Sequence, residues 1–416
     1  MPDMDTGSHS GEFDDFDEVG QLKDLRITPI DDDDCIEELE EEGIEFQEDE
    51  EVGEVILGFV EKPKNPWSLH RQYFPSKAGG TPAWLNPINL PFGNAILCDS
   101  CQQPLSFLLQ VYAPISVDES DSAFHRTLFV FVCPTMSCLL RDQHEQWKRG
   151  QGTVSRSVKI FRCQLPLNNP FYSSQPPSND GATKPSCSGA PLCSWCVTWK
   201  GDKFCGVCRN ARYCCQNHQG MHWRAGHKTN CQDSILSSPP TSKNVKAACN
   251  NLWPEFELIQ VPESEFDERK NEEIINHNSL IALSKKKDDS MVSLIDTFQA
   301  DEEKQCWASF QDRISKFPQQ VLRYCREDGA KPLWPMVAGR PVSSDIPKCR
   351  HCNGPLKFEF QIMPQLLYYF GVKNDTDSLD WATIVLYTCE ASCEAGGTYG
   401  EEFGWVQLWS QSTTMY

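Results

Sequence analysis

The stretch CSWCVTWKGDKFCGVCRNARYCCQNHQGMHWRAGHKTNC, residues 193–231, organises this chain around closely spaced cysteines and histidines. They form four pairs: Cys193 with Cys196, Cys205 with Cys208, Cys214 with His218, and His227 with Cys231. Two such side chains two or three residues apart can reach one tetrahedral zinc ion, so four pairs in series predict two zinc sites. The stretch has almost no aliphatic core, so metal binding must supply much of its folding free energy.

The order of the pairs resembles the MYND zinc finger, in which alternate pairs share a zinc ion. Tyr213 before Cys214 and the Trp223-x3-His227-Lys228 run also match that family. By position, the resemblance implies one site made by Cys193, Cys196, Cys214 and His218, and a second made by Cys205, Cys208, His227 and Cys231. Most MYND fingers carry cysteine at the position of His218, which leaves Cys215 as an alternative ligand. Closed sites lack an open catalytic position, so the finger is either purely structural or a peptide-binding module.

The cysteine content of the whole chain also favours metal binding. Fourteen of the 21 cysteines lie in ligand-like clusters, as is typical of metal sites in a reducing compartment rather than of disulfides. The other seven are expected to be buried or free thiols: Cys35, Cys163, Cys187, Cys215, Cys249, Cys306 and Cys325. No apolar run approaches the ~18 residues of a membrane span, and the N-terminus is acidic rather than signal-like. We therefore expect a soluble, intracellular protein that does not contact membranes.

The charge is concentrated at the N-terminus. Residues 1–54 contain 23 Asp and Glu against Lys23 and Arg26, which accounts for the net charge of −21 of the whole chain. Few apolar residues accompany these charges, so the segment is predicted to be a disordered acidic tail. Its role is either solubility or a transient counter-charge for a basic client. The remainder is electrically neutral, which disfavours direct nucleic-acid binding because phosphate contacts need clustered Lys and Arg.

A β-rich α+β fold is predicted around the finger. Runs of β-branched and aromatic residues predict strands at residues 55–60, 105–112, 128–132, 253–259 and 383–388. One helix is predicted over residues 301–325, where Trp307, Phe310, Ile314, Phe317 and Val321 recur at helical spacing.

Two parts of the chain carry the same motif. Gly79-x2-Pro82-x-Trp84 and Cys98-x2-Cys101-x2-Pro104-Leu105-x-Phe107-x2-Gln110 reappear as Gly329-x2-Pro332-x-Trp334 and Cys349-x2-Cys352-x2-Pro355-Leu356-x-Phe358-x2-Gln361. A strand before each later cysteine pair completes the match, so we expect one duplicated zinc-knuckle β unit. A third zinc site is predicted from Cys98, Cys101, Cys133 and Cys138. Cys349, Cys352, Cys389 and Cys393 form either a fourth site or a set of buried cysteines that close a β turn.

These patterns set the domain boundaries. We expect the tail at 1–54, the first half of a composite β domain at 55–170, a linker at 171–189, the MYND-type finger at 190–231, a second linker at 232–251 and the second half at 252–416, with a mobile charged loop at about 263–289. Each half has too few strands to cover its own sheet, so the halves should pack together. The finger should then be removable without unfolding its host.

Further motifs resemble the programmed cell death protein 2 family over about residues 55–416. They are Phe74-Pro75-Ser76-Lys77-x-Gly79-Gly80-x-Pro82-Ala83-Trp84-Leu85, residues 104–114, Pro254-Glu255-Phe256-Glu257 and Met363-Pro364-Gln365-Leu366-Leu367. The resemblance implies a dedicated cytoplasmic chaperone that captures a newly made small-subunit ribosomal protein, called S two in eukaryotic naming and universal small-subunit protein five, and supports 40S maturation. The acidic tail would raise the encounter rate with such a basic client.

Two other functional classes compete with the chaperone. An enzyme is not expected, because the chain shows no Walker loop, no G-x-G-x-x-G after a strand and no open metal site with a general base. The alternative to the chaperone is a nuclear adaptor in transcriptional regulation or apoptosis, whose finger binds proline-rich peptides. Interaction data separate these two hypotheses.

Overall fold

The computed structural model describes residues 53–116, 121–148, 155–231, 252–265, 302–373, 375, 377–394 and 399–409. All of them belong to one unit of the chain, Glu50–Tyr416. The predicted acidic tail lies outside the described residues except for its last two positions. The predicted linker at 232–251 lies outside them, as does the predicted charged loop after residue 265.

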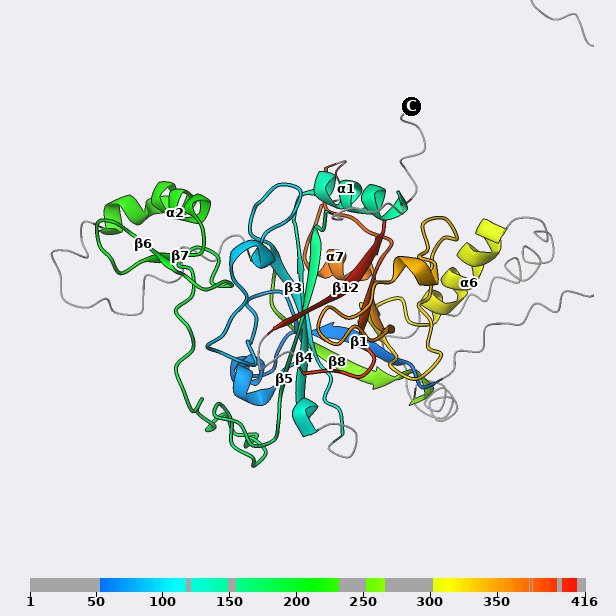
Figure 1. The fold of residues 1–416 in the computed structure, drawn as a ribbon, viewed down its shortest axis with the longest axis horizontal. Helices are drawn as coiled ribbons and strands as arrows, with labels where there is room; N and C mark the ends of the chain where they lie inside the picture. The colour runs from blue at the N-terminus through cyan, green and yellow to red at the C-terminus, as the bar shows by residue number, and fades with distance from the viewer. Residues whose placement is uncertain are drawn as a thin grey trace, which may run out of the picture. The chain divides into compact units, whose positions relative to one another are not determined.

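Ten antiparallel strands form one closed barrel (Figure 1). Around the barrel the order is β1 (Ile56–Glu61), β8 (Phe256–Pro262), β2 (Lys77–Ala78), β3 (Ser106–Tyr112), β4 (His125–Val132), β5 (Val158–Leu165), β12 (Gly400–Gln407), β11 (Thr383–Cys389), β10 (Leu356–Ile362) and β9 (Leu322–Tyr324), which pairs with β1. Closure pairs the sheet edges that would otherwise invite aggregation. The barrel confirms the β-rich fold class.

Strands that precede the finger in the sequence and strands that follow it are intermixed around this barrel. β8 lies between β1 and β2, and β12 pairs with β5, with Glu401 opposite Phe161. The strands before residue 170 and those after residue 252 therefore complete one barrel between them.

Among the described residues, four α-helices accompany the barrel. They are α1 (Met136–Trp147), α2 (Gln216–His222), α6 (Glu302–Lys316) and α7 (Gln365–Tyr369), with 3-10 turns η1 (Pro66–Leu69), η2 (Arg71–Tyr73), η3 (Gly93–Ile96), η4 (Asp121–Ala123) and η8 (Ser343–Asp345), and the π-helical turn η5 (Trp223–His227). The finger adds a hairpin of β6 (Lys203–Phe204) and β7 (Arg212–Tyr213). No helix among the described residues has the length and apolar character needed to cross a membrane.

Strand β4 illustrates why these residues form a buried β-barrel. Its sequence HRTLFVFV is rich in β-branched and aromatic residues, and all eight side chains are buried. A strand that is buried on both faces needs cover outside the sheet as well as within it. Part of that cover comes from Trp84 and Trp199, whose rings pack on Phe131.

Two predicted elements differ from the structure. The helix predicted for residues 301–325 ends at Lys316, and residues 322–324 form strand β9 instead. Pro318 explains the end, because a proline cannot donate the next helical hydrogen bond and disfavours helical backbone at Phe317. The strand predicted for residues 253–259 begins only at Phe256 and continues to Pro262. The other predicted strands are confirmed.

The two segments that share a motif have similar local geometry. The β3–β4 register shifts between Phe107 and Leu109, and the β10–β11 register shifts between Phe358 and Phe360. Gln110 accepts a hydrogen bond from the amide of Ala83 through its side chain. Gln361 accepts one in the same way from Leu333. Each glutamine thus ties the loop before its C-x2-C turn to the strand after it.

Candidate metal centres

Four groups of cysteine and histidine side chains have potential ligand atoms that all lie within 4.8 Å of one another. They are the N-terminal barrel cluster (Cys98, Cys101, Cys133 and Cys138), the first finger cluster (Cys193, Cys196, Cys214 and His218), the second finger cluster (Cys205, Cys208, His227 and Cys231) and the C-terminal barrel cluster (Cys349, Cys352, Cys389 and Cys393). The sequence analysis assigned the same residues to the same four sets. Each group could hold one metal ion.

Every cluster begins with a C-x2-C turn of one backbone shape. The carbonyl of Cys98 accepts a hydrogen bond of 2.8 Å from the amide of Gln102, whose φ is 57°. Val197, Arg209 and Asn353 occupy the same place in the other three turns, with the same bond and with φ between 53° and 58°. Residues with side chains rarely adopt positive φ, least of all a β-branched valine. The turn is therefore held by its surroundings, and a bound metal would contribute to holding it.

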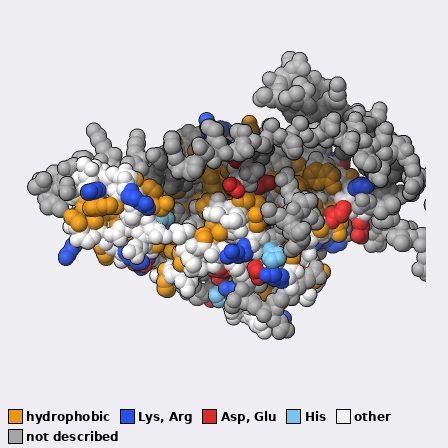
Figure 2. All heavy atoms as spheres, turned by 90° about the horizontal axis from the view of Figure 1, so that it is seen from above, with side chains coloured by type: hydrophobic (Ala, Val, Ile, Leu, Met, Phe, Trp, Pro, Cys, Tyr) orange, Lys and Arg blue, Asp and Glu red, His pale blue; other side chains and the backbone are white. Residues whose placement is uncertain are grey.

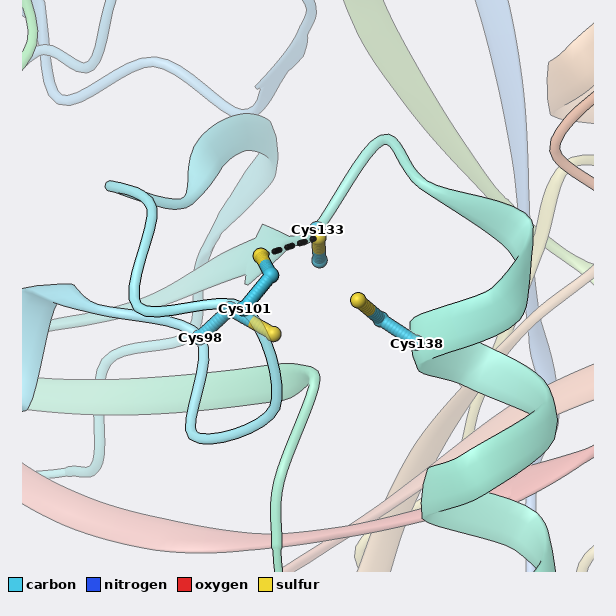
Figure 3. A group of neighbouring side chains, drawn as sticks. All are labelled: Cys98, Cys101, Cys133 and Cys138. Carbon is cyan, nitrogen blue, oxygen red and sulfur yellow. Dashed lines mark hydrogen bonds between the residues drawn. The ribbon is translucent and has the colours of Figure 1, made fainter. Parts of the chain in front are cut away.

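The N-terminal barrel cluster joins three elements. Cys98 and Cys101 lie on their turn, Cys133 directly follows β4, and Cys138 lies in the first turn of α1 (Figure 3). The sulfurs of Cys101 and Cys133 are 3.6 Å apart. All these side chains are buried except that of Cys101, which is partly exposed. A metal ion here would link the C-x2-C turn and α1 to the end of β4.

The finger clusters interleave along the chain. In the first, His218 Nδ1 lies 3.1 Å from the sulfur of Cys214 and 3.8 Å from that of Cys193. In the second, Cys208 Sγ lies 3.6 Å from Nε2 of His227, and Cys205 and Cys231 are 3.7 Å apart through their sulfurs. Each cluster thus combines an early pair with a later pair.

Cys215 has a different place. Its sulfur accepts a hydrogen bond of 3.3 Å from the backbone amide of His218 and so caps the N-terminus of α2. It does not belong to the first finger cluster. His218 is the residue that brings its side chain to that cluster.

The C-terminal barrel cluster lies among arginines. The sulfurs of Cys349 and Cys393 are 3.6 Å apart, as are those of Cys352 and Cys389. Arg162 of β5 donates to the carbonyl of Cys393 at 2.9 Å. Four thiolates with one divalent ion carry a net charge of −2, so nearby guanidinium groups would stabilise the loaded site.

Within each barrel cluster, the pKa values of neighbouring thiols are shifted in opposite directions. The contact with Cys133 lowers the pKa of Cys98 to about 5, whereas burial raises the pKa of Cys138 to about 12. In the C-terminal barrel cluster the amide of Gly354 lowers the pKa of Cys352 to about 7, and burial raises the pKa of Cys393. A divalent cation would resolve this conflict, because it stabilises the thiolate form of every ligand. These soft donors fit a thiophilic ion.

The finger is anchored to the barrel by the residues between its first two C-x2-C turns. Trp199 is fully buried, and its Nε1 donates to the carbonyl of Leu105 at 2.8 Å. Trp84 donates in return to the carbonyl of Thr198 at 3.0 Å. The ring centroid of Trp199 lies 4.3 Å from that of Phe131 in β4. These contacts argue against the expectation that the finger can be removed without disturbing its host, and that expectation stays a prediction.

Sequence reasoning missed the buried charges inside the barrel. Arg126 and Glu359 have no exposed side-chain surface and form an ion pair. Arg162 and Glu402 form a second ion pair, and their side chains are almost as fully buried. The available signal was the charge within each strand, since a lone arginine or glutamate in an otherwise apolar run needs a buried partner.

The fold and the clusters together define a class of protein: a closed β-barrel with four cysteine or cysteine–histidine clusters that could hold metal ions, two of them in an inserted finger. Family models described as "Programmed cell death protein 2, N-terminal domain" and "Programmed cell death protein 2, C-terminal putative domain" match residues 54–179 and 304–408. The chain belongs to the programmed cell death protein 2 family.

Individual relatives agree with this assignment. Programmed cell death protein 2 of Bos taurus is 36% identical over 86% of this chain and 97% of its own length, and that of Mus musculus is 37% identical over 85% and 96%. "Probable 20S rRNA accumulation protein 4" of Schizosaccharomyces pombe is 23% identical over 81% of this chain and 92% of its own length. No solved structure matches the chain.

Proposed function

We propose that this protein is a dedicated chaperone that captures a newly made 40S ribosomal protein, eukaryotic small-subunit protein S two, in the cytoplasm. The observation that carries the proposal is the similarity over most of both chains to a fission-yeast protein whose name refers to accumulation of 20S rRNA. The similarity to that protein supports a role in ribosome biogenesis.

The charge distribution is compatible with such a client. Free ribosomal proteins are basic, and the acidic residues 1–54 would attract them over a distance set by the salt concentration. The tail would raise the association rate, and the barrel would hold the client. An extended segment bound to a groove or sheet edge is the binding mode that suits a β-rich scaffold.

The four clusters are proposed to hold zinc. Sites with four cysteines, or with three cysteines and one histidine, are typical of closed structural zinc centres, and the four groups have these compositions. The interleaved pairs support a MYND-type finger. Such sites would contribute folding free energy and would perform no chemistry.

The barrel halves are further proposed to be copies of one zinc-knuckle unit. The equal register shifts near Phe107 and Phe358 and the equivalent hydrogen bonds of Gln110 and Gln361 support this proposal. The matching turns at Cys98 and Cys349 also support it.

Native purification from cells, followed by mass spectrometry, tests the function. The chaperone proposal expects one small-subunit ribosomal protein in near-equal amount with the chain. Recovery of chromatin regulators with proline-rich segments, together with absence of the ribosomal protein, would overturn it in favour of a nuclear adaptor.

A further inference from the structure

Charge alone does not single out a client-binding surface on the barrel. On the described part of the barrel face in Figure 2, lysine and arginine side chains lie among aspartates and glutamates. The hydrogen-bonding edges of the strands are more specific, because an unpaired edge can bind an extended segment of another chain through its backbone.

The barrel is closed through β2 over only two residues. In that stretch Lys77 lies opposite Glu257 of β8. One position before β2, the carbonyl of Ser76 still accepts a hydrogen bond of 3.0 Å from the amide of Leu258. Strand β8 continues beyond this bond to Pro262, so its outer half extends past the end of β2.

The chain before Ser76 cannot prolong β2. Pro75 has no amide proton for a ladder bond, and Phe74 has a φ of 50°, which is far from that of an extended strand. The ring of Phe74 is stacked on that of His125 in β4, with the ring centroids 4.1 Å apart. This stacking holds the turn that ends β2.

The alternation of hydrogen-bonding directions identifies the backbone groups left at this edge. In an antiparallel sheet every second residue points its amide and carbonyl to the same neighbouring strand. Leu258 points to β2, so Gln260 and Pro262 point to that side as well. Gly58 lies opposite Gln260 in β1, and its carbonyl accepts from Val321 on the other side of β1 at 2.8 Å. Among the described residues, none forms a backbone hydrogen bond with Gln260 on the outer side.

The residues of β8 suit an open edge. A proline within a strand is confined to positions where no partner needs its amide, and Pro262 lies on the outer side. All residues of β8 except Leu258 are partly exposed. The outer half of β8 is therefore accessible to an added strand.

Two carboxylates beside this edge favour a basic segment. Glu61 and Glu257 lie directly opposite each other in β1 and β8, which costs free energy because like charges repel. Neither forms an ion pair with a described lysine or arginine. Ile259 shares their face of the sheet, since side chains alternate along a strand. A lysine or arginine from an added strand would relieve the repulsion.

We propose that the outer edge of β8, from Ile259 to Pro262, binds an extended basic segment of the client as an added strand. The backbone of that segment would bond to the amide and carbonyl of Gln260 and to the carbonyl of Pro262. Its basic side chains would lie beside Glu61 and Glu257. This binding mode rests on the proposed function, which supplies a basic client.

Binding of the purified ribosomal protein, small-subunit protein S two, to the full-length chain tests the proposal through Gln260→Pro. This change removes an amide that donates nothing to β1, so the β1–β8 ladder stays intact while the proline ring blocks the outer edge. We expect binding to weaken about tenfold. Gln260→Ala is the matched control, because it keeps the amide and removes only the side chain, and it should bind normally.

Charge reversal tests the edge without a change to the backbone. Glu61→Lys with Glu257→Lys should weaken binding about fivefold at low salt, and the difference should shrink in about 0.5 M salt. Glu145→Lys on α1 with Asp312→Lys on α6 changes the net charge equally and is the control. This control should leave the affinity unchanged.

Hydrogen exchange gives a readout at the edge itself. The amide of Gln260 should exchange rapidly in the free protein and about tenfold more slowly in the complex. The amide of Val261 bonds to Leu57 in β1 and should be protected in both states. Protection of Val261 in the Gln260→Pro variant shows that β8 remains paired with β1.

The outcomes distinguish failure of this binding mode from failure of the proposed function. If the unsubstituted chain does not bind the ribosomal protein, the proposed function is wrong, and the binding mode falls with it. If the chain binds, but Gln260→Pro binds equally well and the Gln260 amide is not slowed, the client is held elsewhere and only the binding mode is overturned. Slow exchange of that amide in the free protein would show that another segment or a second copy already covers the edge, which would also overturn it.

Discussion

Arg126 of β4 and Glu359 of β10 form an ion pair inside the barrel, although the two strands are separated by three others in the sheet. Nη2 of Arg126 lies 2.7 Å from Oε2 of Glu359, and Tyr324 donates to the same carboxylate at 3.2 Å. Arg126 also donates to Ser392, close to the C-terminal barrel cluster. The pair therefore links the strands before the finger with those after it.

Removing one partner of this pair should be strongly destabilising. Arg126→Met or Glu359→Met leaves an uncompensated buried charge, and each should lower the free energy of unfolding by about 3–5 kcal/mol. The double variant should lose much less than the sum of the two, because it removes both members of the pair. Denaturant titration of all four proteins measures the coupling. Additive losses would show that the two side chains act independently.

The same pair predicts a pH dependence. Burial alone would raise the pKa of Glu359, but Arg126, Arg326 and Thr388 together lower it to about 2. An unfolded glutamate titrates near ~4.3, so the stabilisation is present above that pH and is lost as pH falls toward about 2. Protonation of this one carboxylate should lower the free energy of unfolding by about 3 kcal/mol.

Comparison with Glu359→Gln isolates this contribution. Any metal ions held by the clusters would be lost in acid from both proteins, so that effect should cancel in the difference between their unfolding free energies. The difference should shrink as pH falls from about 4.5 to 2. A constant difference across this interval would contradict the assignment to Glu359.

Five of the ten barrel strands (β1, β3, β4, β8 and β11) and the four clusters could be predicted from sequence because their signals are local. A C-x2-C pair forces its two sulfurs together whatever surrounds it, and an apolar run such as that of β4 needs only its own residues to indicate a strand. The repeated motif then placed the cysteines at 349 and 352 beside those at 389 and 393.

Long-range arrangement could not be predicted in this way. The insertion of β8 between β1 and β2 depends on pairings between residues about two hundred positions apart, which leave no local pattern. Trp199 lies within the finger sequence, yet its ring is fully buried and packs on Phe131 of β4. Neither fact follows from spacing or periodicity.

Trp199→Ala should therefore destabilise the barrel as well as the finger. Truncation of a fully buried tryptophan typically costs about 3–5 kcal/mol, and here it also leaves the carbonyl of Leu105 without its donor. Trp199→Phe is the matched control and should lose about half as much, since it keeps an aromatic ring. Hydrogen exchange of β4 amides reports the barrel directly. Normal protection of β4 in Trp199→Ala would show that finger and barrel unfold separately.

Metal content provides a direct count of the clusters. We expect four zinc ions per chain, and one fewer in Cys101→Ser and in Cys352→Ser, because each removes a ligand from a different barrel cluster. Cys215→Ser is the control and should keep four, since its sulfur only caps α2. Elemental analysis of the purified proteins measures this. A count of two in the unsubstituted chain would restrict metal binding to the finger.

Client capture separates the roles of tail and barrel. Deleting residues 1–54 should slow capture of the ribosomal protein at low salt and leave its dissociation nearly unchanged, because charges screened over ~8 Å at physiological salt act chiefly on association. Cys98→Ser with Cys101→Ser should abolish capture, since loss of the metal would release both the turn and α1 from the end of β4.

The finger gives the contrasting case in the same experiment. Cys193→Ser with Cys196→Ser should weaken capture only to the extent that loss of the Trp199 contacts destabilises the barrel. Capture by this variant should therefore recover at lower temperature, where a larger fraction of the protein has a folded barrel. Rate constants for client binding at two temperatures and two salt concentrations distinguish these effects. If capture by the Cys193 and Cys196 variant stays absent while β4 remains protected from exchange, the finger itself holds the client, and the assignment of binding to the barrel is wrong.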